Sequence, residues 1–176
     1  MINRERLTNT FCELVSIDSP SGEEEEVSKY IESKLTELGF ILLKDDYGNL
    51  IAKTESNNNN LILSAHMDTV EPGRGIIPVV EKDIIKSKTD TILGGDCKAG
   101  LTGILEALDS LNEENYEFKN LVLIFMLFFS SNLFVFIMSI SQLTVPNFNK
   151  PIVISFSFAT ALLVLKISEK KRLLKS

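Results

Sequence analysis

A long apolar run in the second half of the chain is the feature that most constrains its fold. From Leu121 to Ser141 the sequence holds 21 consecutive uncharged residues, most of them Leu, Phe, Ile, Val or Met. About 20 such residues are what a helix needs to cross the hydrocarbon core of a membrane. Pro151–Leu165 is a second, shorter uncharged run. The pattern predicts one or two membrane helices, at about residues 121–141 and 151–167, although the shorter run also suits a buried core helix.

The charged residues divide the chain into two parts of opposite character. Residues 1–117 hold 23 of the 24 acidic residues and 11 of the 18 basic ones, whereas residues 118–176 hold seven basic residues and one acidic residue. An acidic first part argues against a nucleic-acid partner, because phosphates require a basic surface. If both apolar runs span a membrane, the basic C-terminal segment EKKRLLKS places both termini in the cytoplasm.

The N-terminus and the cysteines agree with a cytoplasmic first part. The first residues contain no apolar run long enough for a signal peptide. Cys12 and Cys97 form no CxxC pair and no disulfide framework. We therefore expect reduced thiols and a cytoplasmic head, with membrane association only through the C-terminal tail.

The first 125 residues alternate between helical and strand-like segments. Apolar spacing predicts a helix that ends near Ser16, a second that ends at Gly39, and a third that carries Leu101 to Leu111. Strands are predicted at Phe40–Leu43, Asn49–Lys53, Leu61–Ala65, Ile84–Lys86 and Leu121–Phe125. This alternation indicates an α/β domain with helices on the faces of a sheet.

The first candidate site comes directly after the strand predicted at Leu61–Ala65. His66, the only histidine of the chain, stands where open α/β sheets build their ligand sites. Asp68 follows two residues later and can accept the second ring N–H, which is the usual arrangement around a zinc-bound histidine. The same pattern also fits a structural or surface histidine.

The second candidate site is the glycine-rich segment LGGDCKAG, which opens the third helix. Asp96 can cap that helix, or it can act as a carboxylate ligand that bridges two metal ions. The flanking glycines allow a close approach of the backbone. One cysteine beside one aspartate matches no closed zinc-site spacing, so we interpret Cys97 as incidental.

Taken in order, the segments ELVSIDSPSGEE, LILSAHMDTVEPGRGI and LGGDCKAG resemble peptidase T-like tripeptide aminopeptidases, from Arg4 to Phe125. These enzymes belong to a broader di-zinc group that includes aminoacylases and carboxypeptidase G. The resemblance implies a mixed sheet flanked by helices, two zinc ions in an intact site and a small peptide substrate. It makes His66 a ligand of one zinc and Asp96 the bridge between both. Asp68 becomes the catalytic-site residue that orients and polarises the histidine.

The resemblance ends at Phe125. In the family, paired glutamates follow this strand, the first a general base and the second a zinc ligand, whereas here no acidic residue occurs between Glu117 and Glu169. The later aspartate and histidine ligands and the dimerisation domain also have no counterpart. We therefore expect an incomplete zinc-peptidase catalytic domain at residues 1–125, with at most partial zinc binding and impaired hydrolysis, followed by a non-family apolar tail at 126–176.

Several alternatives stay open at this point. The tail can result from a disrupted coding sequence that replaces the rest of a truncated enzyme. It can also belong to a membrane-anchored, non-catalytic protein with a cytoplasmic metal- or peptide-binding head. If the chain derives from an enzyme, a deacylase or a carboxypeptidase of the same group is an alternative to a tripeptidase, because the residues that select the substrate lie in the missing part.

Overall fold

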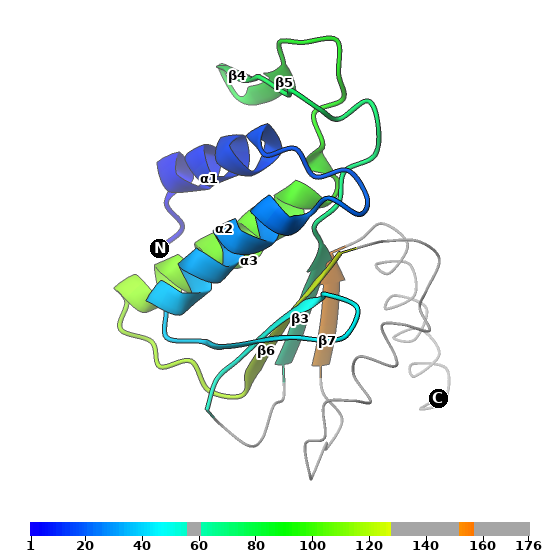
Figure 1. Cartoon of the computed structure of the whole chain (residues 1–176). Coiled ribbons are helices and arrows are strands. Elements are labelled where there is room, and N and C mark those ends of the chain that lie inside the picture. Colours follow the sequence, from blue (N-terminus) through cyan, green and yellow to red (C-terminus); the bar gives the residue numbers. More distant parts are fainter. Residues whose placement is uncertain (56–60, 128–151, 157–176) are drawn as a thin grey trace, which may run out of the picture.

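A computed structural model describes residues 1–55 and 61–127, together with the backbone of residues 152–156. The helices and strands, shown in Figure 1, are in chain order α1 (Arg4–Ser16), α2 (Glu25–Glu37), β1 (Ile41–Lys44), β2 (Leu50–Lys53), β3 (Leu61–His66), β4 (Pro78–Glu81), β5 (Ile84–Ser87), α3 (Gly95–Glu113), β6 (Leu121–Met126) and β7 (Ile152–Phe156). The predicted α/β helices and strands of the first 125 residues are all present, within a few residues of their expected ends.

Five of the strands form one mixed sheet in the order β1-β2-β6-β3-β7. Strand β6 lies in the middle, antiparallel to β2 and parallel to β3, and β7 pairs in parallel with the other side of β3. Strands β4 and β5 form a separate antiparallel hairpin, of which only β5 was predicted. The prediction of an α/β fold with a mixed sheet flanked by helices is confirmed.

Both apolar runs contribute strands to this sheet. Leu121–Met126 is β6 and Ile152–Phe156 is β7, so the prediction of membrane helices at 121–141 and 151–167 is wrong for these two stretches. A strand buried on both faces carries a continuous apolar run, which a membrane helix also does. Residues 128–141 of the first run, and residues 151 and 157–165 of the second, lie outside the described residues. Within the part of the chain that the structure describes, no helix is long and apolar enough to cross a membrane.

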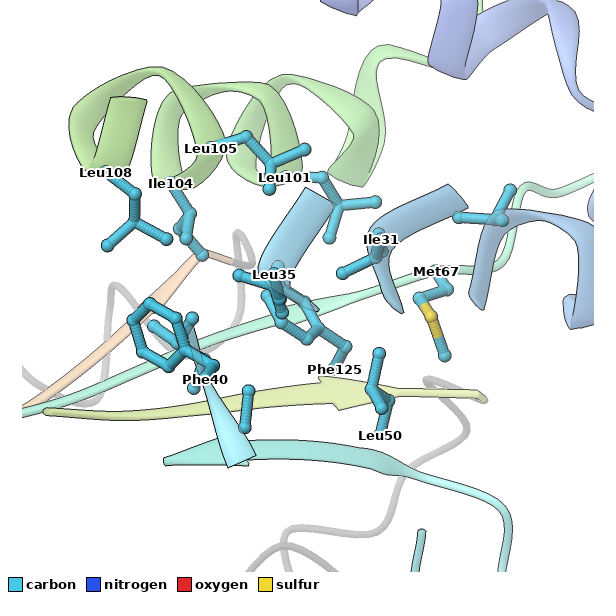
Figure 2. Packing of buried hydrophobic residues seen from close by; sticks show 14 of the residues in the cluster. Ile31, Leu35, Phe40, Leu50, Met67, Leu101, Ile104, Leu105, Leu108 and Phe125 are labelled. Carbon is cyan, nitrogen blue, oxygen red and sulfur yellow. The ribbon is translucent and has the colours of Figure 1, made fainter. Parts of the chain in front are cut away.

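The main core lies between one face of the sheet and the helices (Figures 1 and 2). Helices α2 and α3 both cover this face, and α1 packs beside α3. Figure 2 shows Ile31 and Leu35 of α2 and Leu101 and Leu108 of α3 directed toward the sheet, where Phe125 meets them. All five side chains are almost completely buried. This packing holds the start of α3 against the ends of the central strands.

Alternate residues of the strands point to the opposite face of the sheet. There Ile51, Ile62, Val122 and Ile124 form a second buried apolar cluster. Since successive strand side chains point to opposite faces, β6 is apolar on both of its faces. This two-sided burial is the physical reason why its sequence lacks the alternation of a half-exposed strand.

Candidate metal centre

The candidate site lies where the parallel strands β3 and β6 end. His66 is the last residue of β3 and pairs in register with Met126 of β6. The next residue, Met67, donates its backbone N–H to the carbonyl of Met126 at 2.8 Å. The first turn of α3 lies at the same end of the sheet, where the carboxylate of Asp96 contacts the ring of His66. Pairing between the two strands therefore fixes the direction in which the histidine leaves the sheet.

His66 lies between two carboxylates. Its Nδ1 is 2.8 Å from Oδ1 of Asp68, and its Nε2 is 3.2 Å from Oδ1 of Asp96. The other oxygen of Asp68 accepts a hydrogen bond from the hydroxyl of Ser21 at 2.7 Å. His66 and Asp68 are buried, whereas the Asp96 side chain is 74% exposed. The structure thus brings together the three residues proposed from the sequence, in an arrangement with one buried and one open side.

The two carboxylates also set the charge state of the ring. Burial lowers the pKa of His66, but the hydrogen bonds and negative charges of Asp68 and Asp96 outweigh it, so that the net pKa is raised. A metal ion at Nε2 would replace the proton that the carboxylates attract to this position. The same negative charges would favour a bound cation.

A left-handed glycine lets α3 start close to the histidine. Gly94 has φ 69° and ψ 24°, a backbone conformation that costs other residues free energy. A Cβ atom at this position would lie 3.1 Å from Cγ2 of Thr69 and 3.3 Å from Cδ1 of Ile76. Both the conformation and the close contact therefore require glycine at the turn that presents Asp96.

Cys97 belongs to the same cluster, although sequence reasoning set it aside as incidental. One ligand atom each from His66, Asp96 and Cys97 lie within 4.8 Å of one another. The Cys97 side chain is buried, and burial raises the pKa of its thiol to about 11 despite backbone hydrogen bonds from His66 and Gly100. The spacing of the sequence could not reveal this proximity, because Cys97 approaches His66 only through the packing of α3 on β3.

A buried lysine under the site was also missed by sequence reasoning. Lys98 is only 1% exposed, and its Nζ donates a hydrogen bond to Oγ of Ser19 at 2.7 Å. Desolvation lowers the pKa of Lys98 to about 8, against the opposing charges of Asp68, Glu24 and Asp18. The ammonium group thus lies in an acidic, buried environment close to the His66–Asp68 pair.

Ser19 connects this lysine to the loop that follows β3. Its hydroxyl donates to the carbonyl of Met67 at 3.0 Å, and its carbonyl accepts the backbone N–H of Thr69 at 2.8 Å. Pro20 forms an isolated parallel bridge with Thr69. These contacts hold the segment before α2 against Met67 and Thr69, the residues on either side of Asp68.

The donor set fits a zinc ion. Imidazole nitrogen, carboxylate oxygen and thiolate sulfur are all zinc ligands, and three protein ligands are usual for a catalytic zinc. His66, Asp96 and Cys97 offer one such atom each. Asp68 contacts the other ring nitrogen of His66, Nδ1. A carboxylate in this position is the common outer partner of a metal-bound histidine.

Known proteins of similar sequence and structure include peptidases. An uncharacterized protein of Bacillus subtilis, YqjE, is 42% identical over 127 residues, which are 66% of this chain and 34% of the relative. A tripeptidase from Staphylococcus aureus superposes with a TM-score of 0.66 at 36% identity, over 71% of this chain and 36% of the peptidase. Aminopeptidase PepT from Bacillus cereus gives a TM-score of 0.65 at 39% identity, over 70% and 36% of the two chains. No model of a protein family matches the chain.

These comparisons confirm the resemblance to peptidase T-like enzymes for the N-terminal part of the chain. The chain spans about one third of the length of the relatives that it matches. What the matched peptidases share with it is the fold of this part, a mixed sheet flanked by helices.

Proposed function

We propose that this chain, whose N-terminal part resembles that of peptidase T-like tripeptidases, is the metal-binding part of a zinc-dependent peptidase that acts on small peptides. One observation carries the proposal: the ring of His66 is held between a buried carboxylate, Asp68, and an exposed carboxylate, Asp96, at the ends of parallel strands. The 36–39% identity to a tripeptidase and to an aminopeptidase supports amide hydrolysis of the aminopeptidase type.

Each residue has a separate task in this proposal. Asp68 accepts the Nδ1–H of His66, which orients the ring and leaves Nε2 as the ligand atom. Asp96 stands at the exposed side, where its two oxygens can serve one ion or bridge two. Zinc, when bound, supplies Lewis-acid polarisation of water and of the peptide carbonyl.

We also propose that this chain hydrolyses peptides poorly or not at all. General-base catalysis requires a carboxylate that takes a proton from the attacking water. The resemblance places this group shortly after β6, and the sequence has no acidic residue from there to Glu169. We expect metal binding without efficient turnover, because the proposed ligands His66 and Asp96 are present, whereas the general-base carboxylate has no counterpart in the sequence.

Metal titration of the full chain tests the binding part. We expect zinc binding by calorimetry that is abolished by His66→Ala and weakened by Asp96→Asn. Asp83→Asn serves as a matched control, because Asp83 is an exposed aspartate whose partner is Arg4. Unchanged zinc affinity in His66→Ala would overturn the proposed site.

A peptidase assay of the zinc-loaded and cobalt-loaded chain tests the impairment separately. We expect no tripeptide hydrolysis above that of the His66→Ala variant. Turnover that disappears with His66→Ala would contradict the impairment while supporting the peptidase assignment. Adding metal in excess during the assay ensures that an empty site does not explain inactivity.

A further inference from the structure

We propose that Cys97 supplies a thiolate ligand to the metal ion at His66 and Asp96, and that this thiolate makes the site select thiophilic ions such as zinc, cobalt and cadmium over magnesium and manganese. This inference rests on the proposed metal site and assigns it a third ligand. Thiolate is a soft ligand that magnesium and manganese avoid, whereas imidazole and carboxylate alone discriminate less.

The positions of the three donor atoms support this assignment. Atoms from His66, Asp96 and Cys97 lie within 4.8 Å of one another. Two ligand atoms of one tetrahedral zinc lie roughly 3.5 Å apart, given zinc–nitrogen and zinc–sulfur bonds of about 2.0 and 2.3 Å. The Nε2 atom of His66 and Oδ1 of Asp96 are already 3.2 Å apart, so closing the group around an ion requires only that the distances to the sulfur shorten by about 1 Å.

The thiol lies on the closed side of the site. Cys97 is 4% exposed, whereas the Asp96 side chain is 74% exposed. Backbone hydrogen bonds from His66 and Gly100 to the sulfur hold it beside the ring. An ion at this place would have sulfur and nitrogen on its buried side and the carboxylate toward solvent. Cys97 thus lies at the border between the hydrophobic core and the imidazole–carboxylate pair.

Ligation has a defined proton balance. The S–H bond of Cys97 breaks, its proton passes to bulk water, and a metal–sulfur bond forms without any change of oxidation state. Metal binding by the wild-type chain should therefore release one more proton than binding by a variant that lacks the thiol.

The electronic spectrum of the cobalt-loaded full chain tests the assignment. Thiolate ligation gives an intense sulfur-to-cobalt charge-transfer band in the near ultraviolet, in addition to the weaker visible bands of tetrahedral cobalt. We expect both features in the wild type, loss of only the charge-transfer band in Cys97→Ser and Cys97→Ala, and no change in Cys12→Ser. Cys12 is the matched control because it is the other cysteine and lies in α1.

Each outcome of this experiment either supports or overturns the role of Cys97. Visible bands without charge transfer in the wild type, or charge transfer that persists in Cys97→Ala, would overturn the role of Cys97 and leave the site of His66 and Asp96 intact. Absence of both bands would overturn the proposed metal site as well. If the Cys97 variants do not fold, the Cys12→Ser spectrum still decides, because Cys97 is then the one remaining cysteine of the chain and the only source of a thiolate charge-transfer band.

Metal competition gives a second, independent readout. In Cys97→Asp, which replaces sulfur with oxygen, the ratio of cadmium to manganese affinity should fall about tenfold or more. An equal loss of affinity for both ions would indicate that the substitution only disturbs the fold, and would contradict thiolate selectivity.

Discussion

The Nδ1 atom of His66 lies 2.8 Å from Oδ1 of Asp68, and this contact determines which ring nitrogen faces Asp96. The hydroxyl of Ser21 holds the second carboxylate oxygen of Asp68, so the carboxylate cannot rotate freely. Orientation of the imidazole therefore depends on a residue that would itself not touch the metal.

Asp68→Asn tests this dependence. An amide accepts the Nδ1–H less strongly and can offer a donor in its place, so we expect zinc affinity to fall about 10- to 100-fold. Calorimetric titration of the full chain measures the change, with Asp83→Asn as the control for loss of one exposed carboxylate. Zinc affinity equal to that of the wild type would show that Asp68 does not position the ring.

Ser19→Ala should destabilise the protein, because Ser19 is completely buried and its hydroxyl has polar partners. The substitution removes an acceptor from the buried ammonium of Lys98 and a donor from the carbonyl of Met67. An unsatisfied buried polar group costs about 1–3 kcal/mol, and denaturant unfolding should show a loss of this size.

Ser16→Ala is the matched control for that substitution. Its hydroxyl is exposed and donates to the carbonyl of Cys12 within α1. We expect a change of less than about 0.5 kcal/mol. Equal losses for both serines would contradict the importance of the Ser19–Lys98 contact.

Gly94→Ala should lower both stability and metal affinity. Alanine in the left-handed conformation costs about 1–2 kcal/mol, and its Cβ would press against Thr69 and Ile76 beside the site. Gly103→Ala is the control, because Gly103 lies inside α3 and a Cβ atom added there would meet nothing within 4 Å. That change should stabilise the helix by about 0.5–1 kcal/mol. Improved stability of Gly94→Ala would refute the requirement for glycine at this position.

Stability at low pH should depend on Glu106, which connects α1 to α3. Its carboxylate accepts hydrogen bonds from Nε of Arg6 at 2.7 Å and from the backbone N–H of Asn3 at 2.6 Å. Burial raises the pKa of Glu106, but these contacts and one from Ser110 outweigh burial and lower the pKa from 4.5 to about 2. A lowered pKa stabilises the folded state above the ordinary pKa, and this contribution disappears as the pH falls from about 4.5 to about 2.

The size of this contribution follows from the shift. It corresponds to about 3 kcal/mol, since one pKa unit is about 1.4 kcal/mol. The free energy of unfolding, compared between about pH 6 and about pH 3, should fall less in Glu106→Gln than in the wild type. Glu5→Gln, at an exposed position of α1, serves as the control for the removal of one carboxylate. If the free energy of unfolding fell equally in Glu106→Gln and in the wild type, the Glu106 carboxylate would not be the source of the pH dependence.

The alternation of strands and helices could be predicted because each segment carries a local pattern. Val27, Ile31 and Leu35 repeat at helical spacing, and Gly39 ends the helix with a positive φ. Local pattern was insufficient at Leu121–Met126, where an apolar run fits a membrane helix and a doubly buried strand equally well. Pairing with β2 and β3 decided between them.

The site shows the same division. The sequence alone determined that His66 is the only histidine of the chain, and its motifs, together with the resemblance to peptidase T-like enzymes, predicted Asp68 and Asp96 as the carboxylates beside it. Only the tertiary structure decided that Cys97 and the buried Lys98 belong beside them. The physical reason is that patterns along the chain report local conformation, whereas the side chains of the candidate metal centre approach one another only when α3 packs against the end of β3.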